Sequence, residues 1–257
     1  MTQQLQTAHI GYNENFFSAA VSPPADKQLR IYKAIAHNRS GGSINVGLVK
    51  KFKAANTAFK VYSITAASTP DAADITDAVL AGTSADIFTT TNNDGFLIQS
   101  QNKFELISFL ISQAQTGAPV YTYEYFNGTA FTTLTTIDVP ASYAVGKKVV
   151  AFNAPLDWAT GSTAGVGGEL TGYYSILVRA ITAPTTAVKA ANASGSSVSI
   201  GRFLDFREGI SDNGTVEFSI LGNSDLVLTL DAGESLAPYF SGTASADNSL
   251  MAQYTTV

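Results

Sequence analysis

The sequence predicts an all-β protein made of two β-sandwich-like domains. Apolar and polar residues alternate in many short segments, and turns rich in Gly and Asn separate these segments. Short strands at this spacing are typical of sandwiches and barrels. The chain has 257 residues, of which 45 % are hydrophobic, so it is long enough to bury two cores.

Residues 1–28 are predicted to form an extended N-terminal arm. They show no sustained hydrophobic period, and the pair Pro23-Pro24 favours a non-helical exit. The arm carries three aromatic anchors, Tyr12, Phe16 and Phe17. These side chains either order the arm against a neighbouring subunit or pack on the body of the same chain, and the sequence leaves both alternatives open.

The first β-domain part is expected at residues 29–95. Residues 29–35, 44–48 and 59–64 alternate as strands do. Residues 71–80 read either as a short helix or as a loop with a strand. Gly82 is a plausible helix stop in the first case, since glycine readily adopts the left-handed conformation of a helix end.

An aromatic-rich β-domain follows at residues 96–183. Tyr121, Tyr123 and Tyr125 recur at every second position and therefore share one face of a strand. Asn127-Gly128 then predicts a two-residue hairpin turn, because both residues tolerate positive φ.

Residues 184–196 read as a linker, and residues 197–257 as C-terminal strands. These strands either complete the first β-domain, which makes the aromatic domain an insertion, or form a further domain in series. Both arrangements remain open at this stage.

Composition disfavours several function classes. Net charge is −5, and charged residues make up 14 % of the chain against roughly 25 % in an average soluble protein. The largest basic cluster is Lys50-Lys51-Phe52-Lys53, too small for a nucleic-acid-binding face. No apolar run approaches the roughly 18 residues of a membrane span, and no signal peptide is visible. Cysteine is absent, which excludes disulfides and thiolate chemistry.

No residue pattern predicts catalysis, a cofactor or a metal, so we expect a non-enzymatic protein. The two histidines, His9 and His37, lie outside any nucleophile motif. The acids considered for glycoside hydrolysis have no pairing by spacing; they are Glu124, Asp157, Glu169, Asp205 and Glu208. Calcium ligation by Asp71, Asp74 and Asp77, or by residues 92–94, is less expected than capping of turns and helix ends.

The aromatic block resembles a β-domain of tailed-phage structural proteins, including baseplate-associated ones. The shared pattern begins with Tyr123-Glu124-Tyr125-Phe126-Asn127-Gly128 and continues through Phe131, Leu134, Phe152, Pro155, Asp157-Trp158, Tyr173-Tyr174 and Arg179-Ala180. Phe126 and Phe131 stand where Trp is commoner. A second likeness joins residues 31–48 and 226–236 to the two halves of small sandwiches that decorate phage heads and tails.

This resemblance implies a virion structural protein, assembled in the host cytoplasm. The expected role is a capsid decoration or cement protein that contacts the major capsid protein or other virion proteins as a homo-oligomer. A tail or baseplate component is the alternative, and a carbohydrate-binding or glycan-cleaving attachment module is the second. The candidate partner or glycan face comprises Tyr123, Tyr125, Phe126, Phe131, Trp158 and Tyr174. These rings also fit a second interpretation, in which they form the core of the domain. Trp158 is then a buried residue whose indole N–H donates to a carbonyl.

Overall fold

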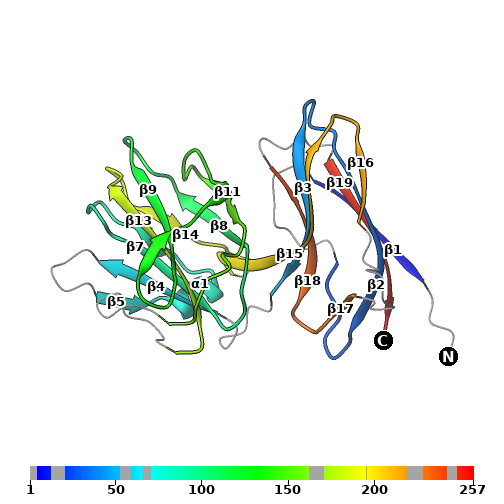
Figure 1. Ribbon diagram of the computed structural model, residues 1–257, viewed down its shortest axis with the longest axis horizontal. Helices are drawn as coiled ribbons and strands as arrows, with labels where there is room; N and C mark the ends of the chain where they lie inside the picture. The colour runs from blue at the N-terminus through cyan, green and yellow to red at the C-terminus, as the bar shows by residue number, and fades with distance from the viewer. Residues whose placement is uncertain are drawn as a thin grey trace. The chain divides into compact units, whose positions relative to one another are not determined.

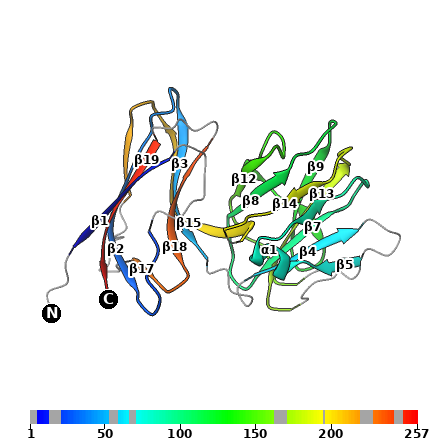
Figure 2. The same ribbon diagram turned by 180° about the vertical axis from the view of Figure 1, so that it is seen from behind.

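The computed structural model confirms the all-β prediction, with antiparallel sheets and one short helix among its described residues. It describes residues 5–12, 21–52, 59–65, 71–161, 171–194, 196–218, 228–241 and 248–257. The chain divides into two compact units (Figures 1 and 2). A terminal unit combines residues 1–53 with residues 201–257, and an inserted unit comprises residues 54–200.

The terminal unit contains two groups of antiparallel strands. The first follows the order β1-β19-β2-β16, and β17 also pairs with β2. The second follows the order β15-β3-β18. Their bounds are β1 Gln6–Tyr12, β2 Leu29–His37, β3 Ile44–Lys51, β15 Val198–Ile210, β16 Thr215–Phe218, β17 Leu228–Leu230, β18 Ser235–Phe240 and β19 Asn248–Thr256. Strand β15 starts in the inserted unit and ends in the terminal unit.

The core of the terminal unit follows from strand alternation. In β2, Leu29, Ile31, Ala34 and Ala36 are buried in the same cluster. The spacing lengthens by one residue after Ile31 because β2 has an irregularity there: Tyr254 pairs with Ile31 and Gln253 with Lys33. A simple two-residue period in the sequence does not locate this irregularity.

The inserted unit also contains two groups of strands. One sheet has the order β10-β9-β13-β7-β4-β5. In the other, β8 lies between β12 and β14, β11 pairs with β12, and β6 pairs with β14. Their bounds are β4 Phe59–Thr65, β5 Asp71–Asp74, β6 Ala85–Phe88, β7 Gly95–Ser100, β8 Leu106–Gln113, β9 Val120–Phe126, β10 Phe131–Thr133, β11 Thr136–Asp138, β12 Gly146–Phe152, β13 Tyr174–Thr182 and β14 Val188–Ala190.

The helix α1, Thr76–Ala81, is shorter than the segment that the sequence offered. Residues 71–74 form strand β5, so both sequence alternatives hold in part. Gly82 ends the helix with φ 71°, in the left-handed region, and its N–H donates to the carbonyls of Ala78 and Val79. The predicted helix stop is therefore confirmed. With six residues this helix is too short to cross a membrane, and the described residues include no other helix.

Two segments differ from their expected descriptions. Within the arm, residues 6–12 form β1, which pairs with β19 of the same chain, and Val21 forms a bridge with Leu236. Within the expected linker, β14 pairs with both β6 and β8, and the Ala191 N–H donates to the Leu110 carbonyl at 3.1 Å. A composition of Ala, Thr and Ser suggested a free connection, but pairing with neighbouring strands satisfies this backbone.

Candidate functional site

The predicted aromatic hairpin is present as β9 and β10, with its turn shifted by one residue. Phe126 pairs with Phe131, and the Asn127 N–H donates to the Ala130 carbonyl at 3.1 Å. The Asn127 side-chain Oδ1 accepts the N–H groups of Thr129 and Ala130. The central residues are therefore Gly128 and Thr129, because Asn127 acts as a cap through its side chain.

The first two tyrosines of β9 belong to a buried aromatic cluster. Tyr143, which is fully buried, lies 4.9 Å from Tyr121 between ring centroids. Its hydroxyl lies 3.2 Å from that of Tyr123. Gln115 Oε1 accepts both the Tyr121 hydroxyl at 2.8 Å and the Tyr143 N–H at 3.0 Å. Phe88, Phe96 and Phe109 complete the cluster.

The cluster shifts the ionisation of its phenols. Burial raises the pKa of Tyr121, Tyr123 and Tyr143 above the ordinary value, because a phenolate loses hydration in an apolar surrounding. These hydroxyls therefore remain protonated donors and acceptors at neutral pH. Their role here is to hold the interior together.

Trp158 is also an interior residue, with 3 % of its surface exposed. Its ring packs edge-on against Phe104, Phe152 and Tyr174, with centroid distances of 5.2, 6.0 and 5.4 Å. Its Nε1–H donates to the Ser175 carbonyl at 3.1 Å. The sequence led us to expect a buried indole with a carbonyl partner, and both parts are confirmed.

Phe126 and Phe131 lie on the other side of their sheet. Strand alternation turns Phe126 away from the face that carries Tyr123 and Tyr125. The two phenylalanine rings are 5.7 Å apart, and Phe131 packs against a separate buried cluster. This cluster contains Tyr62, Ile64, Leu97 and Leu177. The six candidate residues are thus divided between two faces of one sheet.

One end of the first face remains partly exposed and polar. The Tyr125 hydroxyl donates to Asp157 Oδ1 at 2.8 Å, and this bond raises the pKa of Tyr125. Lys103 Nζ lies 5.4 Å from the centroid of the Tyr174 ring and donates to the Pro155 carbonyl at 3.3 Å. We call Lys103, Tyr125, Asp157 and Tyr174 the tyrosine edge. Its two tyrosines are partly exposed, as are Tyr123 and Phe131 elsewhere on the predicted face.

Three of the candidate catalytic acids, Glu124, Asp157 and Asp205, have ordinary structural partners. Glu124 Oε2 lies 3.6 Å from Arg179 Nε on the neighbouring strand, an ion pair too long to be a hydrogen bond. Asp205 pairs with Arg207 at 2.9 Å. Glu169 lies outside the described residues, as do the arm anchors Phe16 and Phe17. Tyr12 ends β1, where its backbone pairs with Asn248.

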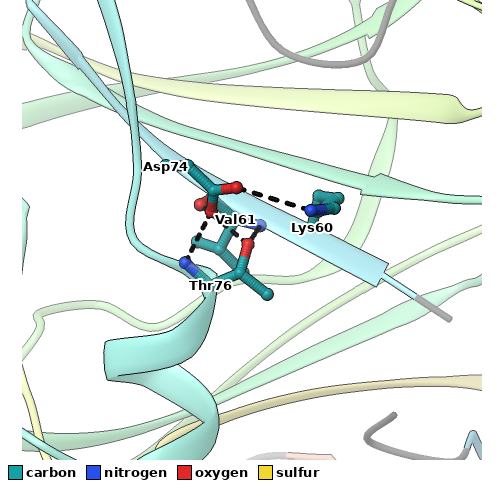
Figure 3. Close-up of polar contacts among 4 residues, drawn as sticks. All are labelled: Lys60, Val61, Asp74 and Thr76. Atoms are coloured by element: carbon teal, nitrogen blue, oxygen red, sulfur yellow. Dashed lines mark hydrogen bonds and ion pairs between the residues drawn. The ribbon is translucent and has the colours of Figure 1, made fainter. Parts of the chain in front are cut away.

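Asp74, one of the considered calcium ligands, holds the backbone at the start of α1. Asp74 Oδ1 accepts the Thr76 N–H at 2.9 Å, and its other oxygen lies 3.5 Å from Lys60 Nζ (Figure 3). The Thr76 hydroxyl bonds the backbone of Val61, which fastens the start of α1 to β4. Burial acts to raise the pKa of Asp74, but the hydrogen bonds to Thr76 and the charge of Lys60 lower it overall. No group of three potential metal ligands occurs among the described residues.

Sequence reasoning missed Tyr143 and Gln115. Both lie in connections between strands, where no periodic pattern marks a residue as buried. Comparison with known proteins finds no matching family, no similar curated protein and no similar solved structure.

Proposed function

We propose that this chain is a non-enzymatic structural protein of a tailed-phage particle, and that it binds the head lattice as a decoration or cement protein. One observation carries the proposal. The residues that resemble phage proteins build the interior and turns of the inserted unit, as Phe126, Leu134, Phe152 and Trp158 do by their burial. These four side chains are apolar or aromatic and pack inside the unit, so the shared pattern supports a structural role for this domain.

The surface chemistry supports an assembled role. Only 14 % of residues are charged, and the six ion pairs of the described residues engage 12 of these 35 side chains. A weakly charged surface rich in hydroxyl groups can approach like surfaces without strong repulsion. The partners of this proposal are the major capsid protein, other virion proteins and further copies of the chain.

A tail or baseplate position is the alternative, because the same aromatic block carries that resemblance. The test is to separate the heads and tails of the particles that contain the chain, and to follow the chain by antibody. A cement protein stays with heads, and heads that lack it rupture at a lower temperature than heads to which purified protein is added back. Co-purification with headless tails contradicts the head assignment and favours the alternative.

The arm supplies a sharper variant for the same assay. Deleting residues 1–24 would also remove β1 and the Val21 bridge, so lost binding could reflect an unfolded terminal unit. The double substitution Phe16→Ser and Phe17→Ser leaves β1 in place. We expect it to lower the occupancy of heads at an unchanged melting temperature. Full occupancy would show that these rings do not anchor the arm to the particle.

The tyrosine edge favours a second candidate function, recognition of a glycan. It combines partly exposed rings with a carboxylate and an ammonium group, which suits stacking and hydrogen bonding to a sugar. The variant Tyr125→Ala tests it, since Tyr125 donates to the exposed Asp157. Loss of measured glycan affinity at unchanged stability would establish this function, and the absence of any glycan binding would remove it.

A further inference from the structure

Strand β1 forms one edge of the first sheet of the terminal unit. All seven of its residues pair with β19, from Gln6 opposite Tyr254 to Tyr12 opposite Asn248. No described strand pairs with its other side. An edge strand turns alternate N–H and C=O groups outward, and these groups can form a new antiparallel ladder with another strand.

The other terminal strands of the described sheets carry features that discourage such pairing. Strand β18 contains Pro238, which has no N–H to donate. Strand β16 carries Glu217, paired with Lys33 at 2.9 Å, and β6 carries Asp86, paired with Lys189 at 3.2 Å. Strand β5 contains two aspartates. Strands β10, β11 and β17 are three residues long. Charge, proline and shortness are the usual means of protecting an edge.

Strand β1 has none of these features. Its sequence, QTAHIGY, contains no Asp, Glu, Lys, Arg or Pro, and the five residues before it contain none either. With seven residues it is the longest edge strand of the described sheets. Gln6 and Thr7 are exposed, and Ala8 packs toward the core of the unit. The open side of β1 is therefore long, uncharged and anchored to a folded sheet.

We propose that β1 pairs with β1 of a second copy of this chain, in antiparallel register about a two-fold axis. The inference rests on the proposed function only for the expectation that copies associate, and it identifies the surface through which they do so. In a two-fold contact each strand pairs with an identical strand. A strand that carries charges of one sign would therefore face charges of the same sign on its partner. An uncharged strand meets itself without this cost. Because β1 carries no charge, it offers no complementary charge to a charged segment of another protein.

The test measures association of the purified full-length chain by analytical ultracentrifugation over a range of concentrations. We expect a reversible dimer for the wild type. The variant Thr7→Lys places a charge on the exposed side of β1 and should raise the dissociation constant by roughly tenfold or more, since charged edge strands resist pairing. The matched control is Thr133→Lys, the same change at an exposed position of edge strand β10. It should leave the dissociation constant unchanged.

A second measurement does not depend on any variant. Amide hydrogen exchange within residues 6–12 should slow as the protein concentration rises through the dissociation constant, because the outward N–H groups become bonded. A wild type that is monomeric at all concentrations, or a dimer that Thr7→Lys leaves intact, overturns the inference. The particle assay reports separately: a chain that binds heads as a monomer refutes only the β1 contact, and a dimer that is absent from particles refutes only the virion role.

Discussion

The indole of Trp158 donates to the backbone carbonyl of Ser175 at 3.1 Å. This serine is fully buried, and its side chain forms further hydrogen bonds. The Ser175 hydroxyl donates to the Gly161 carbonyl at 2.5 Å and accepts from Gln99 Nε2 at 2.8 Å. Through these bonds the ring is tied to β13, and through β13 to β7. Trp158 therefore acts as a structural plug of the inserted unit, and its substitution should lower stability.

Trp158→Phe should destabilise the protein by about 2 kcal/mol, through lost ring area and an unpaired Ser175 carbonyl. Trp158→Ala should cost about 4 kcal/mol, since it also leaves a cavity beside Phe104 and Phe152. Urea denaturation, monitored by circular dichroism, checks both values. Tryptophan fluorescence cannot be used, because both variants lack the only tryptophan of the chain. If both variants unfold at the wild-type urea concentration, the ring does not support the core.

Alkaline conditions should destabilise the inserted unit. Burial raises the pKa of Tyr121, Tyr123 and Tyr143 above the ordinary value of 10.0. A raised pKa in the folded state means that the folded chain holds these protons more tightly than the unfolded chain. The associated stability is complete below pH 10 and is lost as the pH rises above it.

Thermal melting at a series of pH values measures this loss. The ultraviolet absorbance of tyrosine phenolate, recorded during each melt, shows whether the tyrosines ionise as the protein unfolds. Tyr143→Phe provides the control, since it removes the most deeply buried phenol. Its melting temperature should fall less steeply above pH 10 than that of the wild type. Equal slopes would mean that Tyr143 ionises freely in the folded protein.

Acidic conditions should also destabilise the inserted unit, through protonation of Asp74. Its pKa is lowered from the ordinary value of 3.8, so its contribution is present above that value and is lost as the pH falls through the folded pKa. Asp74→Asn should destabilise the protein by at most about 1 kcal/mol at neutral pH, because the carboxylate is partly exposed. The difference between variant and wild type should shrink below pH 3.8, and a difference that persists there would assign the effect to shape and not to charge.

Gly95 lies at a close approach of two strands. A Cβ at this position would lie 1.9 Å from the Val178 carbonyl oxygen on β13, a distance that requires the backbone to move. Gly95→Ala should therefore cost about 3 kcal/mol in unfolding free energy. Gly42→Ala is the control, since a Cβ there has no atom within 4 Å. Equal melting temperatures for the two variants would show that β7 and β13 separate at little cost.

Local structure could be predicted from the sequence where it depends on a regular alternation of residues or on one residue with a distinctive conformation. The alternation of Tyr121, Tyr123 and Tyr125 placed them on one face, and Gly82 marked the end of α1. Trp158 in a short Pro-Leu-Asp-Trp turn signalled a buried ring with a polar tip. Each of these predictions depends on neighbours within a few residues.

Features that depend on pairing were not predictable in this way. The strand β14 has a composition typical of a linker and becomes ordered only because β6 and β8 offer it partners. Asn127 was expected at the tip of the hairpin but caps it instead, since its side chain competes with the backbone for the N–H groups of the turn. The candidate aromatic face was divided because Phe126 follows Tyr125 directly, and adjacent residues of a strand point to opposite sides.

The pairing of Gly201 with Lys51 has a practical consequence for protein engineering. These residues stand at the two points where the chain leaves and re-enters the terminal unit, and as register partners in β15 and β3 their Cα atoms are about 5 Å apart. A tight turn of a few residues is enough to join them. We therefore expect a chain in which such a turn replaces residues 54–200 to keep the register of β3 and β15. The same junction is the place to graft another fold whose own ends lie close together.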